Sequence, residues 1–290
     1  MSRDRRLSMT LVTCFAVAGC SSPVTVATFN IRMFPRPDTD HAQVAKRIAA
    51  VDASIMALQE IGDGRAMAAV LADASQRGER DYRLLLGPCG GDNGRFTTAI
   101  AYDAETWSVV EHIGYPDMLP DGHCGRRQPG TLGVFRNDQG KELGVLSMHL
   151  PAHPYNFDSR KVQWGRVLER VAEAEARHDA PILALGDANS TGFRGEPAEE
   201  RPFVEGLVED AGRTLPTAEL SCTEYWRPPR DDGPFRPSVL DHVVAPSGWK
   251  DARVWGLCER LDCDPTDADE MDPEFVSVSD HCPVTVVGKL

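Results

Sequence analysis

The 290-residue sequence has no C-x-x-C pair, no internal repeat and, beyond residue 20, no apolar run near the roughly 20 residues that span a membrane. It also lacks a basic excess. Its 31 Lys and Arg stand against 44 Asp and Glu, so the whole chain gains no long-range attraction to nucleic acid or anionic membranes. Without C-x-x-C, a zinc or redox interpretation is weak. The glycine-rich stretch 87–94 is followed neither by Gly-Lys-Ser/Thr nor by a helix pattern, so it is not a P-loop.

The N-terminus carries an export pattern. Three Arg residues precede the apolar run LSMTLVTCFAVAG, which is short for a membrane helix but has the length of a signal-peptide core. Small residues lead up to Cys20, which resembles the lipobox of bacterial lipoproteins. We therefore expect residues 1–19 to be a signal peptide, Cys20 to be lipidated and residues 20–23 to be a short tether. The protein would then reside in the bacterial cell envelope, at the outer membrane or in the periplasm, and its lipid would be its only contact with the membrane. The alternative is an ordinary cleaved signal, an incidental Cys20 and a secreted protein.

The remaining cysteines form an even set. Removing Cys14 with the leader and Cys20 for the lipid leaves six, at positions 89, 124, 222, 258, 263 and 282. In an exported protein such a set predicts disulfide bonds. Cys258 and Cys263 are close enough in sequence to close one loop. Pairs Cys89–Cys124 and Cys222–Cys282 would complete the set, although six cysteines allow fifteen pairings.

Strand-like apolar runs alternate with helical patterns from Val24 onward. The period-2 and continuous apolar runs predict strands, and the 3.6-residue periods predict helices. The expected strands are 24–31, 54–60, 82–87, 97–103, 107–115, a hairpin over 132–150 turning at 137–140, 181–187, 238–245, 252–258 and 278–287. The expected helices are 40–52, 63–74 and 159–178. Many strands with few helices, and no Pro/Gly linker, favour one domain over 24–290 built as a two-sheet α/β sandwich.

Polar side chains stand where these apolar runs stop. Functional groups are often placed there by a rigid scaffold, because strand ends at one sheet edge converge. The residues in question are Asn30, Glu60, His149, Asp187, Asn189, Asp241, His242, Asp280 and His281. Taken singly, each has an ordinary explanation, since an Asp after a strand is usually a turn former or a helix cap.

Together these residues resemble a known family. The segments ATFNIR, ALQEIGD, SMHLPAH, ALGDANS, VLDHVVA and VSDHCPV are similar, in this order, to the endonuclease/exonuclease/phosphatase superfamily, which has the fold of deoxyribonuclease I. The resemblance spans residues 24–287. It implies a four-layer α/β/β/α sandwich of two mainly antiparallel sheets and hydrolysis of phosphate esters.

The resemblance also implies a metal site. By position, Glu60 resembles the principal Mg²⁺ ligand, and Asn30 and Asp280 complete the shell of metal and water. Carboxylate and amide oxygens suit Mg²⁺ or Ca²⁺ better than zinc, and Mg²⁺ is the expected ion, with Mn²⁺ as its replacement.

Five further residues receive catalytic roles from the resemblance. Asp187 and Asn189 are similar to the pair that orients the attacking water and holds the phosphate. His149 resembles the imidazole that contacts the scissile phosphate. His281 resembles the second imidazole, and Asp241 the carboxylate that fixes it. Such an Asp–His pair favours imidazolium, which can stabilise developing charge or move a proton.

Three arginines are predicted to bind substrate. Arg32 resembles the deoxyribonuclease arginine that approaches a backbone phosphate. Arg126 and Arg127 lie where the family often carries a substrate-contacting segment, and Arg binds phosphate well. An ordinary solvated position on the surface is an equally supported interpretation of Arg126 and Arg127. Gly62 stands where deoxyribonuclease I carries a groove-inserting Arg, which weakens the case for double-stranded DNA.

The segment ERLDCDPTDADEMDPE (259–274) holds eight acids. Its simplest interpretation is a solvated acidic loop. A structural Ca²⁺ site is the alternative, since Asp264, Asp267 and Asp269 have alternate-ligand spacing, although the Gly and terminal Glu of an EF-hand are missing.

The function predicted from these observations is an exported, metal-dependent phosphoesterase, expected to act as a monomer. Its leading substrate, by analogy, is the phosphodiester of nucleic acid. Without residues 1–19 the chain keeps 28 basic and 43 acidic residues, a net charge of −15. Because this charge disfavours long polyanions, a small phosphorylated metabolite or a lipid headgroup is nearly as strong a candidate substrate. A non-catalytic surface-binding lipoprotein is the third hypothesis.

Overall fold

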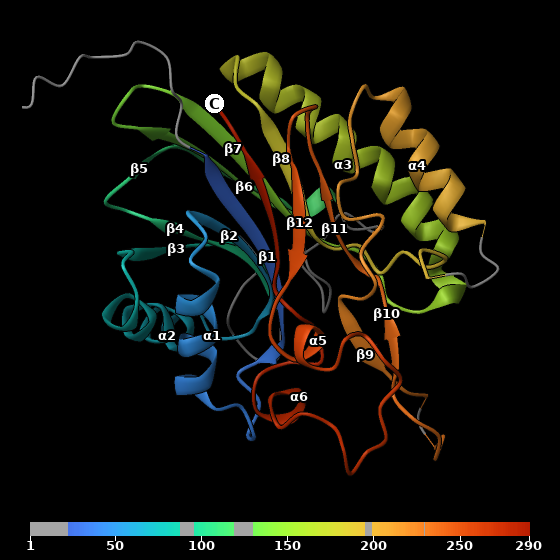
Figure 1. The fold of residues 1–290 in the computed structure, drawn as a ribbon. Coiled ribbons are helices and arrows are strands. Elements are labelled where there is room, and N and C mark those ends of the chain that lie inside the picture. Colours follow the sequence, from blue (N-terminus) through green and yellow to red (C-terminus); the bar gives the residue numbers. More distant parts are fainter. Residues whose placement is uncertain (1–22, 88–95, 119–129, 195–198, 229) are drawn as a thin grey trace, which may run out of the picture.

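The computed structural model describes residues 23–87, 96–118, 130–194, 199–228 and 230–290 (Figure 1). The signal peptide, Cys20, Cys89, Cys124, Arg126 and Arg127 lie outside these ranges, so the predictions for them remain predictions. Within the described ranges no helix combines the length and the apolar character that crossing a membrane requires.

The first large sheet contains the N-terminal strand. Its order is β12-β13-β1-β2-β4-β3, and only β1 and β2 run parallel. Its strands are β1 (Val24–Phe34), β2 (Ile55–Ile61), β3 (Tyr82–Leu86), β4 (Thr97–Asp103), β12 (Lys250–Val254) and β13 (Val284–Gly288).

The second large sheet has the order β11-β8-β7-β6-β5, with β7 and β8 as its parallel pair. Its strands are β5 (Trp107–Tyr115), β6 (Gly130–Asn137), β7 (Glu142–His149), β8 (Ile182–Asp187) and β11 (Asp241–Val244). A small antiparallel pair, β9 (Glu224–Trp226) and β10 (Arg236–Ser238), forms a separate sheet.

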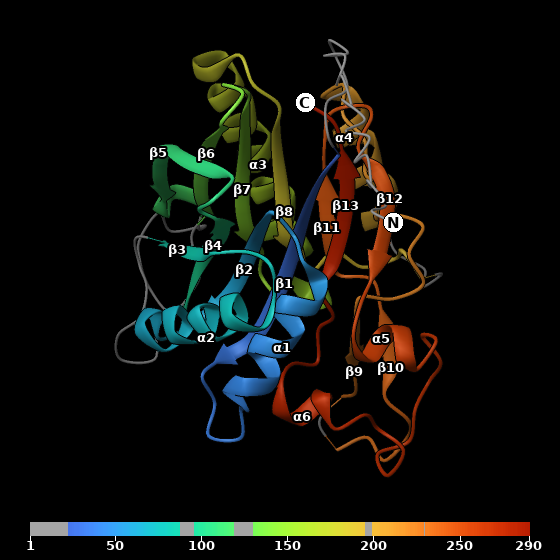
Figure 2. The same cartoon turned by 60° about the vertical axis from the view of Figure 1, so that its left-hand side comes forward.

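Helices cover the outer face of each sheet (Figures 1 and 2). The first sheet carries α1 (His41–Val51) and α2 (Gly64–Arg77), and the second carries α3 (Phe157–His178) and α4 (Glu200–Asp210). The short elements are α5 (Leu257–Arg260), α6 (Glu274–Ser277), η1 (Pro116–Met118) and η2 (Pro154–Asn156). The side chains of Asp40 and Asp63 accept the first free N–H groups of α1 and α2, which fixes where these helices begin.

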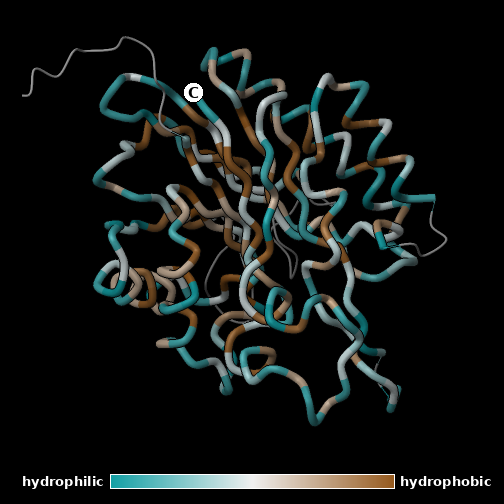
Figure 3. Tube along the Cα trace, in the orientation of Figure 1, coloured by the Kyte–Doolittle hydropathy of each residue, from teal (hydrophilic) through white to brown (hydrophobic). Residues whose placement is uncertain are grey.

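Three apolar layers hold this arrangement together. One lies between α1, α2 and the first sheet, one between the two sheets, and one between the second sheet and α3 with α4. Figure 3 shows the apolar segments gathered in the sheets and the hydrophilic ones on the outside. The four-layer α/β/β/α sandwich predicted from the sequence is confirmed.

Two ends of the predicted strands differ from the structure. The run 252–258 turns into α5 after Val254, and β13 begins only at Val284. Asp280 and His281 therefore precede the last strand, and His281 forms a single bridge to Glu224 of β9. The helix α4 and the strands β9 and β10 were not predicted.

The two parallel pairs bring functional strand ends to one edge of the sandwich. Asn30 pairs with Gln59 near the ends of β1 and β2, and His149 pairs with Asp187 at the ends of β7 and β8. The backbones of β7 and β8 approach closely at Gly186, whose φ is 157° and where an added Cβ would lie 1.8 Å from the carbonyl oxygen of Met148.

The structure corrects the predicted disulfide pairing. The bonds are Cys222–Cys263 and Cys258–Cys282, and neither Cys258–Cys263 nor Cys222–Cys282 forms. Cys258 lies in α5, where its N–H donates to Cys282 Sγ. A left-handed turn at 262–263 separates the two nearest cysteines and leaves Cys263 beside Cys222. Pairing follows the geometry of the Cβ atoms rather than the distance along the sequence.

Three acids of segment 259–274 bind arginines. Arg260 bonds Asp272 at 2.6 Å and Glu274 at 2.9 Å, and Arg47 bonds Glu274 at 2.7 Å. Glu259 pairs with Arg253. Within the described ranges, the groups of three side chains that could hold a metal ion all lie outside this segment. The proposed ligands Asp264, Asp267 and Asp269 do not form such a group, so the structure gives the Ca²⁺ hypothesis no support.

Candidate active site

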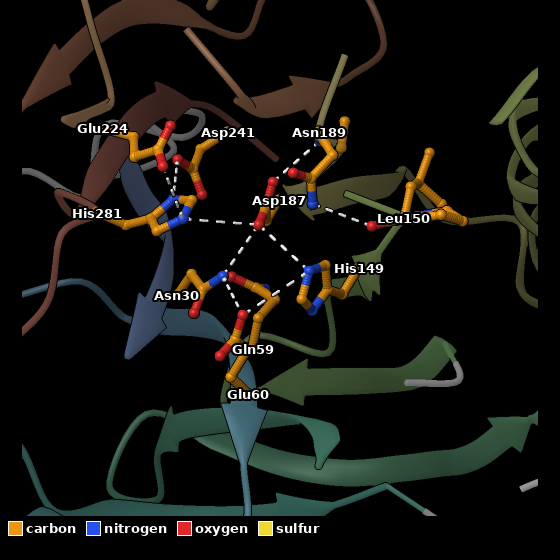
Figure 4. Close-up of polar contacts among 12 residues, drawn as sticks. Asn30, Gln59, Glu60, His149, Leu150, Asp187, Asn189, Glu224, Asp241 and His281 are labelled. Atoms are coloured by element: carbon orange, nitrogen blue, oxygen red, sulfur yellow. Dashed lines mark hydrogen bonds and ion pairs between the residues drawn. The ribbon is translucent and has the colours of Figure 1, made fainter. Parts of the chain in front are cut away.

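Asp187, at the end of β8, is the centre of the polar cluster (Figure 4). Its Oδ2 accepts a hydrogen bond from Asn30 Nδ2 at 2.9 Å, and it lies 3.3 Å from His149 Nε2 and 3.7 Å from His281 Nε2. Burial alone would raise the pKa of Asp187. The charges of His281 and His149, with hydrogen bonds from His149 and Asn30, lower it to about 2. Asp187 is therefore a carboxylate at neutral pH.

His281 is held by Asp241. Its Nδ1 lies 2.9 Å from Asp241 Oδ2, and its backbone N–H donates to Ser279 Oγ. Thr223 Oγ1 accepts the N–H groups of Leu240 and Asp241 and so fixes the start of β11. Burial lowers the pKa of His281, but the negative charges of Asp241 and then Asp187 outweigh it and raise this pKa well above its usual value.

Glu60 reaches the cluster through a bulge. The pairing register shifts in β2 between Leu58 and Ile61, and Glu60 adopts a left-handed φ of 63°. Bulges re-aim side chains, and such strain is found at functional sites. The Glu60 carboxylate accepts the Met33 N–H at 2.6 Å and Asn30 Nδ2 at 3.3 Å.

Asn189 turns back toward the loop after β7. It has a left-handed φ of 51°, its N–H donates to Asp187 Oδ1, and its Nδ2 donates to the carbonyl of Leu150 at 3.0 Å. Asn189 thus joins the ends of β7 and β8.

Arg32 and Asp280 form a pair at the edge of the cluster. Arg32 Nε lies 3.0 Å from Asp280 Oδ2, and its guanidinium also donates to the carbonyl of Phe275. The Arg32 side chain remains 31% exposed, so it can still meet an anionic substrate. The metal role predicted for Asp280 and the substrate role predicted for Arg32 remain predictions.

The donor atoms fit a divalent cation. Glu60, His149 and Asp187 offer ligand atoms within 4.8 Å of one another. His149 Nδ1 is buried and has no hydrogen-bond partner among the described residues, while its Nε2 faces Asp187. Glu60 and Asp187 supply carboxylate oxygens to this set, which suits Mg²⁺ or Mn²⁺. The set shares Glu60 with the predicted metal ligands and does not include Asp280. Asn30 lies beside it with Nδ2 donating to both carboxylates, while its Oδ1 accepts the Arg32 N–H.

Glu224 was missed in the sequence. This residue of β9 is 6% exposed, its Oε1 lies 3.9 Å from His281 Nε2, and its Oε2 has no hydrogen-bond partner in the described part of the chain. Burial, with the nearby charges of Asp280, Asp187 and Asp241, raises its pKa to about 8 against the opposing effect of His281. A three-residue strand is too short to show a periodic pattern, so no signal in the sequence points to Glu224.

The cluster unites seven predicted residues from separate strands and loops: Asn30, Glu60, His149, Asp187, Asn189, Asp241 and His281. His242 lies apart, with its ring against Phe193 and its Nδ1 at Thr217. Carboxylates, amides and two imidazoles at one edge of a four-layer sandwich define a centre that can hold a phosphate group, orient water and move a proton.

Comparison with known proteins agrees with this class. The sequence pattern described as "Endonuclease/Exonuclease/phosphatase family" matches residues 27–281. The chain belongs to the endonuclease/exonuclease/phosphatase family, whose members are hydrolases acting on phosphate esters. No curated protein sequence gives a significant match.

Solved structures share the fold at low identity. Danio rerio TDP2, solved with a single-strand DNA product, is 16% identical over 93% of this chain and 100% of that one, with a TM-score of 0.66. An endonuclease/exonuclease/phosphatase from Bacteroides vulgatus is 15% identical, with the same coverage and TM-score. A mannosyl-6-phosphatase from Bacteroides thetaiotaomicron is 17% identical over 91% and 98% of the two chains, with a TM-score of 0.59.

Proposed function

We propose that this chain is an exported, divalent-metal-dependent hydrolase of phosphate ester bonds. The observation that carries the proposal is the contact of one buried carboxylate, Asp187, with Asn30, His149 and His281 at a single sheet edge. A binding module would not need an ionised acid between two imidazoles, so the cluster argues against the non-catalytic hypothesis.

Each side chain of the cluster has a separate role in the proposed hydrolysis. Asp187 stays ionised and can accept a hydrogen bond from the attacking water, whose other neighbour would be Asn189. His281, kept protonated by Asp241, can stabilise negative charge on the phosphoryl oxygens or give a proton from Nε2 to the leaving oxygen. His149 can donate to a phosphoryl oxygen. A divalent cation bound at Glu60, with Asn30 beside it, would supply charge neutralisation at the phosphoryl group and leaving oxygen.

The proposed substrate is a phosphodiester, with nucleic acid in the first place because of the family resemblance and the DNA product held by the TDP2 neighbour. A small phosphorylated compound is the second candidate. It is favoured by the net negative charge and by the pairing of Arg32 with Asp280, and a mannosyl-6-phosphatase shares the fold.

A substrate panel tests the reaction and ranks the candidates. Plasmid DNA, RNA, bis-p-nitrophenyl phosphate, glucose 6-phosphate and sphingomyelin would be assayed with Mg²⁺, with Mn²⁺ and with EDTA. EDTA should abolish turnover and either cation should restore it. His281→Ala should remove nearly all turnover while the protein stays folded, and His41→Ala, at an exposed imidazole, serves as the control. Wild-type rates in His281→Ala, or full activity in EDTA, would contradict the proposal.

Export through a lipid anchor is proposed on the N-terminal pattern and has its own test. Cys20→Ala should move the protein from the membrane fraction to the soluble fraction and abolish labelling by a fatty-acid analogue. Unchanged fractionation would refute the anchor and leave the phosphoesterase proposal intact.

A further inference from the structure

The strand β9 carries two side chains that the proposed chemistry does not use. Alternate residues of a strand point to the same face, so Glu224 and Trp226 share one face while Tyr225 points away from it. Tyr225 is fully buried in the core formed around the two disulfides. Trp226, in contrast, is 44% exposed, and Glu224 sits beside His281 (Figure 4).

The Glu224 carboxyl lacks a partner for one of its oxygens. Oε2 is buried without a hydrogen bond among the described residues, and Oε1 lies 3.9 Å from His281 Nε2, beyond hydrogen-bond distance. Buried polar groups are nearly always satisfied, because leaving one unpaired costs roughly 1–3 kcal/mol. A group that arrives with the substrate beside His281 would satisfy this one.

The partner must be able to pair with a carboxyl. A hydroxyl group does so in either protonation state, since it can both donate and accept a hydrogen bond. The exposed indole of Trp226 offers a flat apolar face, which suits a ring. Side chains two positions apart on a strand are separated by roughly 6.6 Å, which matches the dimensions of a sugar ring with its hydroxyls.

We propose that Glu224 and Trp226 form a subsite for a hydroxyl-bearing ring, the sugar or nucleoside part of the phosphate ester that reacts at His281. The inference rests on the proposed function and narrows its substrate class. Glu224 determines specificity by binding a hydroxyl, and Trp226 packs against the ring. Neither residue takes part in the bond-breaking step.

Matched pairs of esters test the subsite. Glucose 6-phosphate is paired with p-nitrophenyl phosphate, and thymidine 5′-(p-nitrophenyl phosphate) with bis-p-nitrophenyl phosphate. Each pair shares the scissile phosphate type and differs in the hydroxyl-bearing ring. kcat and KM would be measured for the wild type, Glu224→Leu, Glu224→Gln and Trp226→Ala. Glu270→Leu, at an exposed acid, is the matched control.

The expected result is a change in the ratio of the two kcat/KM values within a pair. Glu224→Leu should lower kcat/KM for the hydroxyl-bearing ester about tenfold more than for its aryl partner, the effect of one lost hydrogen bond to a buried group. Glu224→Gln, which still hydrogen-bonds, should retain most of the preference. Trp226→Ala should raise KM with little change in kcat, and Glu270→Leu should match the wild type.

The following outcomes would count against the proposal. Equal losses on both members of a pair, or no loss in Glu224→Leu and Glu224→Gln, would overturn the subsite while the proposed hydrolysis stands. If Glu224→Leu does not fold, Glu224→Ala takes its place with the same expected change, and an unchanged ratio in that variant overturns the subsite equally. If the wild type hydrolyses none of the esters with Mg²⁺ or Mn²⁺, the proposed function fails and the subsite fails with it.

Discussion

The Nδ1 atom of His281 lies 2.9 Å from Oδ2 of Asp241, although 40 positions separate the two residues in sequence. Asp241 begins β11, and His281 lies in the segment before β13, so the contact joins the two large sheets at their shared edge. The carboxylate fixes the ring and leaves Nε2 facing Asp187.

Asp241→Asn should therefore remove most of the activity without unfolding the protein. The amide keeps the shape but no longer stabilises an imidazolium, so we expect kcat to fall by roughly 10²–10⁴-fold. Steady-state kinetics on the best ester of the panel measure it, and circular dichroism checks the fold. Asp269→Asn, at an exposed acid, should behave as the wild type. A fall of less than threefold in Asp241→Asn would show that the pair has no catalytic part.

Gly186→Ala should destabilise the sandwich at the β7–β8 contact. The new Cβ would meet the carbonyl oxygen of Met148 at 1.8 Å, so the two strands must separate where His149 and Asp187 pair. We expect a loss of about 3 kcal/mol or more in the free energy of unfolding, by denaturant titration. Gly165→Ala is the matched control. It lies in α3 with open space around its Cβ and should stabilise by up to about 1 kcal/mol. Equal stabilities of the two variants would contradict the close approach.

Much of the scaffold could be predicted because each strand or helix shows its own hydrophobic pattern over neighbouring residues. The apolar runs ending at Asn30, Glu60 and Asp187 are long enough to mark strands, and the resemblance to a family supplied their arrangement. The helix α4 was missed because Pro202 and Gly206 interrupt its pattern, although Pro is tolerated in a first turn.

The disulfides and Glu224 could not be predicted because they depend on long-range geometry. Cys258 and Cys263 are neighbours in sequence, yet each bonds a cysteine more than twenty positions away. Glu224 becomes buried only when β9 pairs with the segment at His281. The residues next to Glu224 in the sequence carry no pattern that predicts this contact.

Arg160 and Glu200 form a buried pair that should dominate the stability of the α3–α4 contact. Both residues are at most 2% exposed, and the Arg160 guanidinium donates from Nε and Nη2 to the two Glu200 carboxylate oxygens at 2.6 and 2.8 Å. Arg160 also donates to the carbonyls of Pro151 and His153 in the loop after β7. Arg160→Met leaves the buried Glu200 without its cation, with only the Thr191 hydroxyl donating to it, so we expect a loss of about 3–5 kcal/mol in the free energy of unfolding, measured by denaturant titration.

Two further variants check this interpretation of the pair. Arg160→Met with Glu200→Met should recover part of the loss, because no buried charge remains unpaired. Arg83→Met removes an exposed pair with Asp81 and should cost under about 1 kcal/mol. A double variant that is less stable than Arg160→Met alone would argue that the carbonyl contacts matter more than the ion pair.

His242 should make the protein less stable in mild acid. Its ring is buried against Phe193, and burial lowers its pKa from 6.5 to about 3 despite the charge of Asp187. Between these two values the unfolded chain binds the proton and the folded chain does not. The stabilisation is therefore complete above pH 6.5 and is lost as the pH falls toward 3, by up to about 1.4 kcal/mol per pH unit.

Replacing His242 should flatten that dependence. His242→Phe keeps a ring of similar shape without a titrating group. Between pH 7 and pH 5, its free energy of unfolding should fall by about 1–2 kcal/mol less than that of the wild type. The comparison uses the change with pH, so a constant cost from the lost hydrogen bond to Thr217 cancels. His41→Gln, at an exposed position, should follow the wild-type profile. Parallel profiles for wild type and His242→Phe would show that His242 takes up its proton in the folded protein as readily as in the unfolded chain.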